Sequence, residues 1–187
     1  GYTAQVESLP VEEAARLTQE FLDCLTGPVI AHQGTLDKYT GDGLVAFWGA
    51  PLPEPHHADL ALDAARAILE RVERLSRERS AAGHKLLRVR IGIESGPAMA
   101  GDFGTAFRSI YTAVGDSVNT ASRLEQAARD YPHSAIIGPG TVALARRHRF
   151  LALGERVLRG KGRPTPLFTF AQEAGDVAGV RGMAEQA

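Results

Sequence analysis

A short stretch in the N-terminal third of the chain constrains its fold more than any other part of the sequence. Residues 35–39 and 44–48 are β-prone, and Thr40-Gly41-Asp42-Gly43 separates them. Asp-Gly and Gly-rich sequences between two such runs are typical of tight hairpin turns. The stretch therefore predicts a β-hairpin whose tip carries the carboxylate of Asp42. A carboxylate held at a tight turn suits a hard cation, but on spacing alone a purely structural turn is the simpler interpretation.

The rest of the chain divides into helices and strands. Apolar periodicity predicts helices at residues 11–32 and 61–82. Asp116-Ser117 is predicted to cap a third helix at residues 116–129, and a fourth short helix is predicted at residues 141–149. We expect Gly27-Pro28 to bend or interrupt the first of them. Short β-prone runs predict strands at residues 87–94, 98–100, 111–114, 156–158 and 167–171. This order predicts an α+β domain with helices on one face of a sheet.

Composition disfavours several classes of function. The 187 residues are enough for one domain with a proper core, and the net charge of −1 does not favour nucleic acid as a partner. Cys24 is the only cysteine, which excludes an internal disulfide and a cysteine-rich zinc module and fits a reducing cytoplasmic setting. No apolar run approaches the ~20 residues of a membrane helix, and there is no P-loop sequence.

Four segments carry a resemblance to a known family. Residues 36–51, which contain the predicted hairpin, closely resemble the metal-binding hairpin of the class III nucleotidyl cyclases. Residues 111–125 resemble the strand-to-helix motif that carries the transition-state residues of that family. Residues 89–101 are similar to a further segment, and residues 159–162 are similar to the phosphate-binding loop. The resemblance extends over nearly all of residues 1–171 in the order and spacing of the family.

The resemblance implies a ferredoxin-like βαββαβ domain that works as a head-to-tail homodimer. ATP and two Mg²⁺ or Mn²⁺ ions would bind where the protomers meet, and attack of the ribose 3′-hydroxyl on the α-phosphate would give cyclic AMP and pyrophosphate. Asp42 would bind metal, Asn119 would orient the ribose and Arg123 would stabilise the transition state. Arg159 and Lys161 would bind the phosphates, with Arg159 standing where the family often has Lys.

The hydrogen-bond donors and acceptors of adenine and guanine indicate which nucleotide this chain would bind. Lys38 stands where the family places its purine-reading residue, and Thr112 holds the second reading position. Adenine presents an acceptor at N1 and a donor at N6, whereas guanine presents the reverse, so a cationic donor favours ATP. The hydroxyl of Thr112 can accept from N6. Taken alone, Lys38 is more simply an exposed strand lysine.

Besides Arg159, the sequence departs from the family in two places. The family carries a second metal carboxylate on a first strand, and this sequence opens at Gly1-Tyr2-Thr3, just past that position. We therefore expect a catalytic domain over residues 1–173 with its first strand upstream of Gly1, a flexible tail at 174–187, and little or no turnover by the fragment itself. Pro97 lies where some relatives carry a phosphate-directed Arg.

Two alternatives to an active enzyme follow from the same residues. One is a catalytically silent cyclase-homology domain that dimerises or senses nucleotide. The other is an RNA-binding ferredoxin-like domain, which would need exposed aromatic residues on its sheet and a basic face, and neither is evident. Residues 47–51 resemble cyclase domains attached to membrane receptors, so the cytoplasmic domain of a larger receptor is a further expectation.

Overall fold

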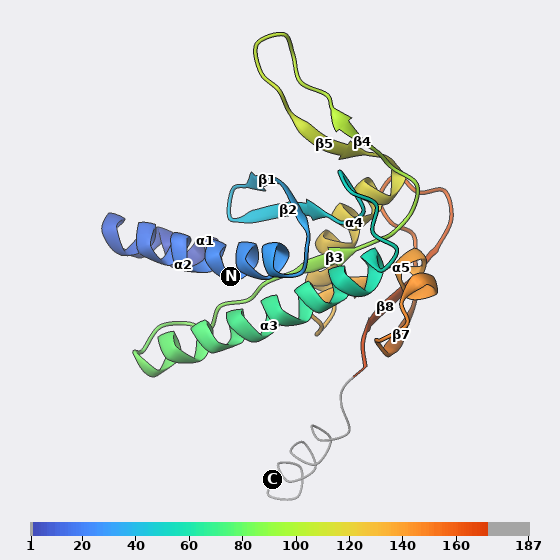
Figure 1. Ribbon diagram of the computed structural model, residues 1–187. Coiled ribbons are helices and arrows are strands. Elements are labelled where there is room, and N and C mark those ends of the chain that lie inside the picture. The colour runs from blue at the N-terminus through green and yellow to red at the C-terminus, as the bar shows by residue number, and fades with distance from the viewer. Residues whose placement is uncertain (1, 172–187) are drawn as a thin grey trace, which may run out of the picture.

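The computed structural model describes residues 2–171 (Figure 1). Its helices are α1 (Tyr2–Glu7), α2 (Val11–Ala31), α3 (His57–Ala81), α4 (Asp116–Ala127), the 3-10 helix η1 (Ala128–Asp130) and α5 (Pro139–Leu144). Its strands are β1 (Thr35–Thr40), β2 (Gly43–Phe47), β3 (Ile91–Ile93), β4 (Met99–Asp102), β5 (Tyr111–Val114), β6 (Ala135–Ile137), β7 (Phe150–Arg156) and β8 (Thr165–Phe170). This mixture of helices and strands confirms the predicted α+β class.

The strands of residues 2–171 form three hydrogen-bonded sheets. The largest has the order β3-β6-β8-β7, in which β3 and β6 run parallel and the other neighbours run antiparallel. β1 pairs with β2 in the predicted hairpin, and β4 pairs with β5 in a second antiparallel hairpin. Figure 1 shows the β4–β5 hairpin projecting away from the rest of the domain. The two hairpins therefore present residues beside the larger sheet rather than within it.

A first apolar core lies between α2 and α3, which pack against each other. Leu17, Phe21 and Leu25 recur every four residues on α2 and are buried against Ile68 and Val72 of α3. This spacing places them on one face of each helix, as the apolar periodicity of the sequence predicts.

A second core holds α4 against the larger sheet. Thr120 and Leu124 belong to its buried face, and Leu124 is fully buried. Gly92 of β3 lies directly beneath the helix, because a Cβ there would sit 2.0 Å from the carbonyl oxygen of Ala121 and 2.3 Å from the amide nitrogen of Glu125. A glycine at this position lets the helix backbone pack directly on the strand. The opposite face of α4 is left exposed.

The helix predicted at residues 141–149 is wrong beyond Leu144, where α5 ends. The backbone amides of Arg146 and Arg147 instead donate to Oδ1 of Asp59, at 3.0 and 3.1 Å. Asp59 is a buried residue of α3, so it supplies a long-range acceptor that replaces the next turn of helix.

Two strands also differ from the prediction. β3 is shorter than the predicted 87–94, because its parallel partner β6 pairs with only Ile91–Ile93. The strand predicted at 156–158 is wrong, since β7 occupies residues 150–156 and ends where the prediction begins. The register of β7 is irregular around Gly154, which has φ 86°. This irregularity interrupts the alternation of inward and outward side chains, so the sequence pattern does not reveal the strand.

The helices near the N-terminus differ as well. α1 was not predicted from the sequence, and it packs on the core through the stacked rings of Tyr2 and Phe21. α2 continues through Gly27-Pro28 without interruption. Pro28 removes one backbone donor close to the C-terminal end of the helix, where buried Leu25 and Val29 hold the last turns in place.

Two further expectations concern the C-terminal tail and membrane-spanning helices. The tail predicted at residues 174–187 lies outside the described residues. No helix within residues 2–171 is both long and apolar enough to span a membrane.

Candidate active site

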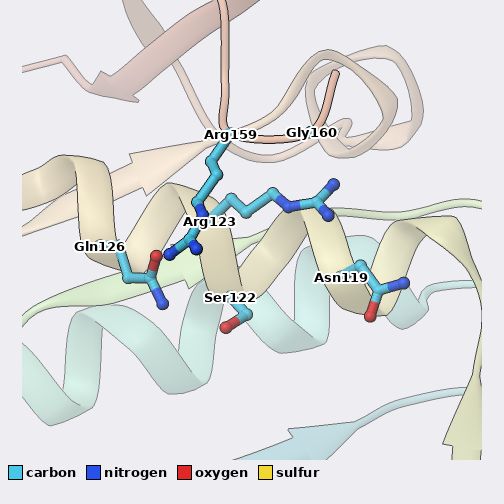
Figure 2. Close-up of a pocket in the computed structure, with 6 residues that line it drawn as sticks. All are labelled: Asn119, Ser122, Arg123, Gln126, Arg159 and Gly160. Carbon is cyan, nitrogen blue, oxygen red and sulfur yellow. The ribbon is translucent and has the colours of Figure 1, made fainter.

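The exposed face of α4 and the turn after β7 enclose a hollow of about 310 Å³. Its lining residues, shown in Figure 2, are Asn119, Ser122, Arg123, Gln126, Arg159 and Gly160. We call it the α4 hollow. In Figure 2 Arg159 reaches from the turn toward the helix, and Asn119 and Gln126 stand at opposite ends of the row of helical side chains.

The spacing of the helical residues explains why they share the hollow. Positions 119, 122, 123 and 126 follow one another by three, one and three residues, which places them on one face of a helix. Thr120 and Leu124 lie on the opposite, buried face. Packing of α4 on the sheet therefore fixes the direction in which Asn119 and Arg123 point.

The turn supplies the second wall of the hollow. Leu158 is buried and anchors the turn, and the amide of Lys161 donates to its carbonyl oxygen at 2.9 Å. Gly160 has φ 75°, and a Cβ there would lie 3.1 Å from Nη2 of Arg123. The guanidinium of Arg123 thus lies close against the backbone of the turn. Arg123 and Arg159 together put two permanent positive charges into one hollow with no carboxylate in its lining, which suits a polyanion.

Lys161 is engaged elsewhere. Its Nζ lies 2.6 and 2.5 Å from the two carboxylate oxygens of Asp116, the first residue of α4. Asp116 was predicted to cap this helix, but it makes no capping hydrogen bond there, and the N-cap position belongs to Gly115. Lys161 does not line the hollow, although it is two residues from Arg159.

Glu94 lies just past the end of β3 and adds a partly buried acid to this region. Its Oε1 accepts hydrogen bonds from the amides of Ser95 at 2.9 Å and Thr141 at 3.1 Å. Burial raises the pKa of Glu94, and the backbone hydrogen bonds and the positive charge of Lys161 only partly offset the effect. Its proton is therefore held more tightly than that of an exposed glutamate.

Asp42 lies at the tip of the β1–β2 hairpin, as predicted. Thr40 pairs with Gly43, which leaves Gly41 and Asp42 as the turn, and Gly41 has φ 62°. The carboxylate is exposed, and Thr3 of α1 donates to its Oδ2 at 3.4 Å. Exposed carboxylate oxygens are the donors that Mg²⁺ prefers, and Mg²⁺ in proteins often takes one or two carboxylates together with substrate phosphates. Among residues 2–171 no group of three acidic, histidine or cysteine side chains is placed to hold a metal.

Lys38 and Thr112 lie on β1 and β5, two strands that contact each other. Lys38 is exposed, and within residues 2–171 its side chain makes no hydrogen bond or ion pair. Thr112 is half-buried, and its Oγ1 donates to Oδ2 of Asp37 at 2.6 Å.

Comparison with known proteins identifies the family. The family model described as the adenylate and guanylate cyclase catalytic domain matches residues 3–169. The chain belongs to the class III nucleotidyl cyclases. Adenylate cyclase 1 of Rhizobium meliloti (strain 1021) is 36% identical over 167 residues, which cover 89% of this chain but 25% of that protein. The chain thus spans about a quarter of the length of this relative.

Solved cyclase structures agree with this assignment. The adenylyl cyclase CyaB from P. aeruginosa has a TM-score of 0.83 and 27% identity, over 94% of this chain and 91% of its own. The guanylyl cyclase Cya2 has a TM-score of 0.77 and 26% identity, over 91% and 86% of the two chains. The cyclase fold predicted from the sequence is therefore confirmed. Because adenylyl and guanylyl cyclases both match, the choice of base depends on this chain's own residues.

Within the cyclase domain six of the seven predicted site residues fall into two groups, and the seventh, Lys161, is paired with Asp116. Asn119, Arg123 and Arg159 meet in the α4 hollow. Lys38, Asp42 and Thr112 lie on the β1–β2 hairpin and β5 and do not line that hollow. Their catalytic and binding roles remain predictions.

Several residues beside these groups were not predicted. Ser122 and Gln126 line the hollow, and helical spacing from Asn119 would have found them. The contacts of Asp37 with Thr112 and of Thr3 with Asp42 join segments 75 and 39 residues apart, so no local pattern signals them.

Proposed function

We propose that this cyclase domain is an adenylate cyclase, which converts ATP to 3′,5′-cyclic AMP and pyrophosphate. The observation that carries the proposal is the α4 hollow, where two side-chain amides and two guanidinium groups come together from a helix and a turn. A nucleoside triphosphate needs such a combination, because its phosphates carry several negative charges and its ribose needs a neutral hydrogen-bonding group.

In the proposed reaction the ribose 3′-oxygen forms a bond to the α-phosphorus. The bond between the α-phosphorus and the oxygen that bridges to the β-phosphorus breaks, pyrophosphate leaves with that electron pair, and the proton of the 3′-hydroxyl passes to solvent water. Asn119 orients the ribose, so that the 3′-oxygen stands in line with the leaving group. Arg123 stabilises the charge that develops on the α-phosphoryl oxygens, because its planar fork carries a permanent charge. Arg159 binds the departing phosphates, and Lys161 joins it once it leaves Asp116.

Asp42 is the residue that we propose as a ligand of Mg²⁺ or Mn²⁺. A bound divalent ion would neutralise charge on the triphosphate and polarise its oxygens. The exposed position of Asp42 at a tight turn supports this role, because its carboxylate oxygens are available to an ion carried in with the nucleotide.

The proposal includes a head-to-tail homodimer. The loop that closes the β4–β5 hairpin carries three exposed large hydrophobic side chains, with Phe107 fully exposed, Phe103 45% exposed and Ile110 41% exposed. The hairpin projects from the domain, so these side chains are free to meet a second copy (Figure 1). Burial of such an apolar patch is the common driving force of association.

Lys38 and Thr112 support ATP as the substrate. The ammonium of Lys38 only donates, which matches N1 of adenine and opposes N1–H of guanine. Thr112 lies on the neighbouring β5, where an oxygen can accept from the N6 amino group.

The test is a cyclic-nucleotide assay with ATP and GTP, in Mg²⁺ and in Mn²⁺, with and without any native residues encoded upstream of Gly1. Cyclic AMP formation should depend on Arg123. We expect Arg123→Ala to lower kcat about 10²–10³-fold. Arg129→Ala is the matched control, because Arg129 is an exposed arginine of η1 that does not line the hollow. Nucleotide binding without product in every form of the protein would contradict the proposal and indicate a silent cyclase-homology domain.

A further inference from the structure

Asp37 stands at an irregularity in the β1–β2 ladder. Leu36 pairs with Ala46 and Lys38 pairs with Val45, so Asp37 has no partner of its own on β2. An unpaired residue of this kind is a β-bulge, which breaks the alternation of side chains and re-aims them, often beside a functional site. In a regular strand the side chains of Asp37 and Lys38 would point to opposite faces. The bulge removes that constraint on the direction of the Asp37 side chain.

The carboxylate of Asp37 accepts a hydrogen bond from a residue of β5. Its Oδ2 accepts a hydrogen bond of 2.6 Å from Oγ1 of Thr112, and both residues are half-buried. A length of 2.5–2.7 Å is characteristic of a hydroxyl that donates to an ionised oxygen, and such bonds are about twice as strong as neutral ones. The single hydroxyl hydrogen of Thr112 is therefore committed to Asp37.

The hydrogen bond to Asp37 decides whether the hydroxyl of Thr112 can donate to a ligand or accept from it. A hydroxyl has one hydrogen and two lone pairs, so a threonine whose hydrogen is occupied can only accept. Lys38 can only donate. Together, the two residues would present one donor and one acceptor, which match N1 and N6 of adenine. Guanine, with a donor at N1 and an acceptor at O6, meets a mismatch at both positions.

We propose that Asp37 is a positioning residue that sets nucleotide specificity by holding the hydroxyl of Thr112 as an acceptor. The inference rests on the proposed function, because it assigns to Lys38 and Thr112 the reading of the purine. Asp37 itself touches no substrate. Without its carboxylate the hydroxyl of Thr112 can rotate and donate to O6 of guanine, so the barrier to GTP at this position disappears.

The test is the ratio of ATP to GTP kcat/KM in the wild type and in Asp37→Asn. Asparagine has the same size, and its amide can donate to Oγ1 and release the hydroxyl hydrogen. We expect the ratio to fall about tenfold, because one buried mismatch with guanine is relieved. Asp23→Asn, on the exposed side of α2, is the matched control and should leave the ratio unchanged. Competition of ATP and GTP for binding gives the ratio of their dissociation constants, which reports the preference for the base without turnover.

A second variant separates positioning from a structural effect. Thr112→Val keeps the shape of the side chain and removes the hydroxyl, so Asp37→Asn in that background should change the ratio no further. A further change there, or an unaltered ratio in Asp37→Asn alone, would overturn the role of Asp37. If Asp37→Asn does not fold, Thr112→Val alone must still lower the ratio, or the inference fails.

The outcomes also distinguish this inference from the proposed function. Equal use of ATP and GTP by the wild type would overturn the inference and leave the cyclase reaction standing. A wild type that neither binds nor converts either nucleotide would overturn the proposed function and the role of Asp37 with it.

Discussion

Replacement of Gly92 by alanine tests how the position of α4 controls the site. A methyl group at Gly92 would lie 2.0 Å from the carbonyl oxygen of Ala121 and 2.3 Å from the amide nitrogen of Glu125, and Cβ atoms essentially never approach other atoms within 3.0 Å. Both obstacles are backbone atoms, so no side chain can rotate away. The helix must instead move by about 1 Å from β3, against a close-packed interior.

The cost of this movement follows from the packing of α4. Insertion of a methyl into a well-packed contact costs about 1–3 kcal/mol, and a backbone obstacle favours the upper part of that range. A loss of about 2–3 kcal/mol corresponds to a fall in Tm of about 4–12 °C for a domain of this size. Asn119 and Arg123 belong to α4 and move with it. A displacement of these side chains by about 1 Å should also lower kcat about a hundredfold.

The matched control is Gly101→Ala in β4, also a strand glycine. A Cβ there would come no closer than 4.0 Å to the ring of Phe103, so we expect stability to change by less than about 1 kcal/mol. Thermal unfolding followed by circular dichroism gives the Tm of both variants, and the cyclic-nucleotide assay gives kcat. Equal Tm values for Gly92→Ala and Gly101→Ala would refute the close approach of α4 to β3.

Four other expectations concern the site and its surroundings. Asp42→Ala and Arg123→Ala should each remove nearly all activity. A mixture should regain part of it, because in the proposed dimer Asp42 of one protomer serves the same site as Arg123 of the other, and some heterodimers keep one such site intact; heterodimers without activity would indicate a site within one chain. Lys38→Glu should lower the ATP to GTP ratio of kcat/KM about tenfold, since a carboxylate would face the N1 acceptor of adenine, and an unchanged ratio would remove Lys38 from base reading. Burial raises the pKa of Glu94 in the folded state, so its contribution to stability is complete below the usual glutamate pKa and is lost as the pH rises through the raised one. Glu94→Gln should flatten that decline in the free energy of unfolding, measured by urea denaturation at a series of pH values, and an unaltered pH profile would contradict it. Phe107→Asp should shift the proposed dimer to monomer in sedimentation experiments while leaving the Tm of the monomer unchanged, because Phe107 is fully exposed in the single chain.

The parts of the fold that were predictable are those with local causes. The β1–β2 hairpin follows from its Gly-Asp-Gly turn, and α2 and α3 follow from the periodicity of their buried faces. The errors arise where a distant residue decides the local structure. Residues 145–149 leave the helix because the buried carboxylate of Asp59 takes the amides of Arg146 and Arg147.

The candidate site likewise contains residues that local sequence patterns place together and contacts that depend on distant segments. Asn119 and Arg123 could be placed together from sequence because four residues make one helical turn. The approach of Arg159 to the same hollow depends on a turn that buried Leu158 anchors beside α4, and no local pattern specifies that packing. The hydrogen bond of Thr112 to Asp37 depends on a bulge and on contact between two hairpins.

The ion pair of Lys161 with Asp116 is compatible with a phosphate-binding role for Lys161. The side chain of Asp116 is 77% exposed, and an ion pair with so exposed a partner contributes at most about 1 kcal/mol, so little free energy opposes its rupture. A triphosphate in the α4 hollow would place several negative charges beside Arg159, two residues from Lys161. At a comparable distance each of those charges would attract the ammonium as strongly as one carboxylate does, so several of them together would outcompete Asp116. In the absence of nucleotide Asp116 therefore keeps Lys161 folded back at the N-terminus of α4, close to the place where the phosphates would arrive.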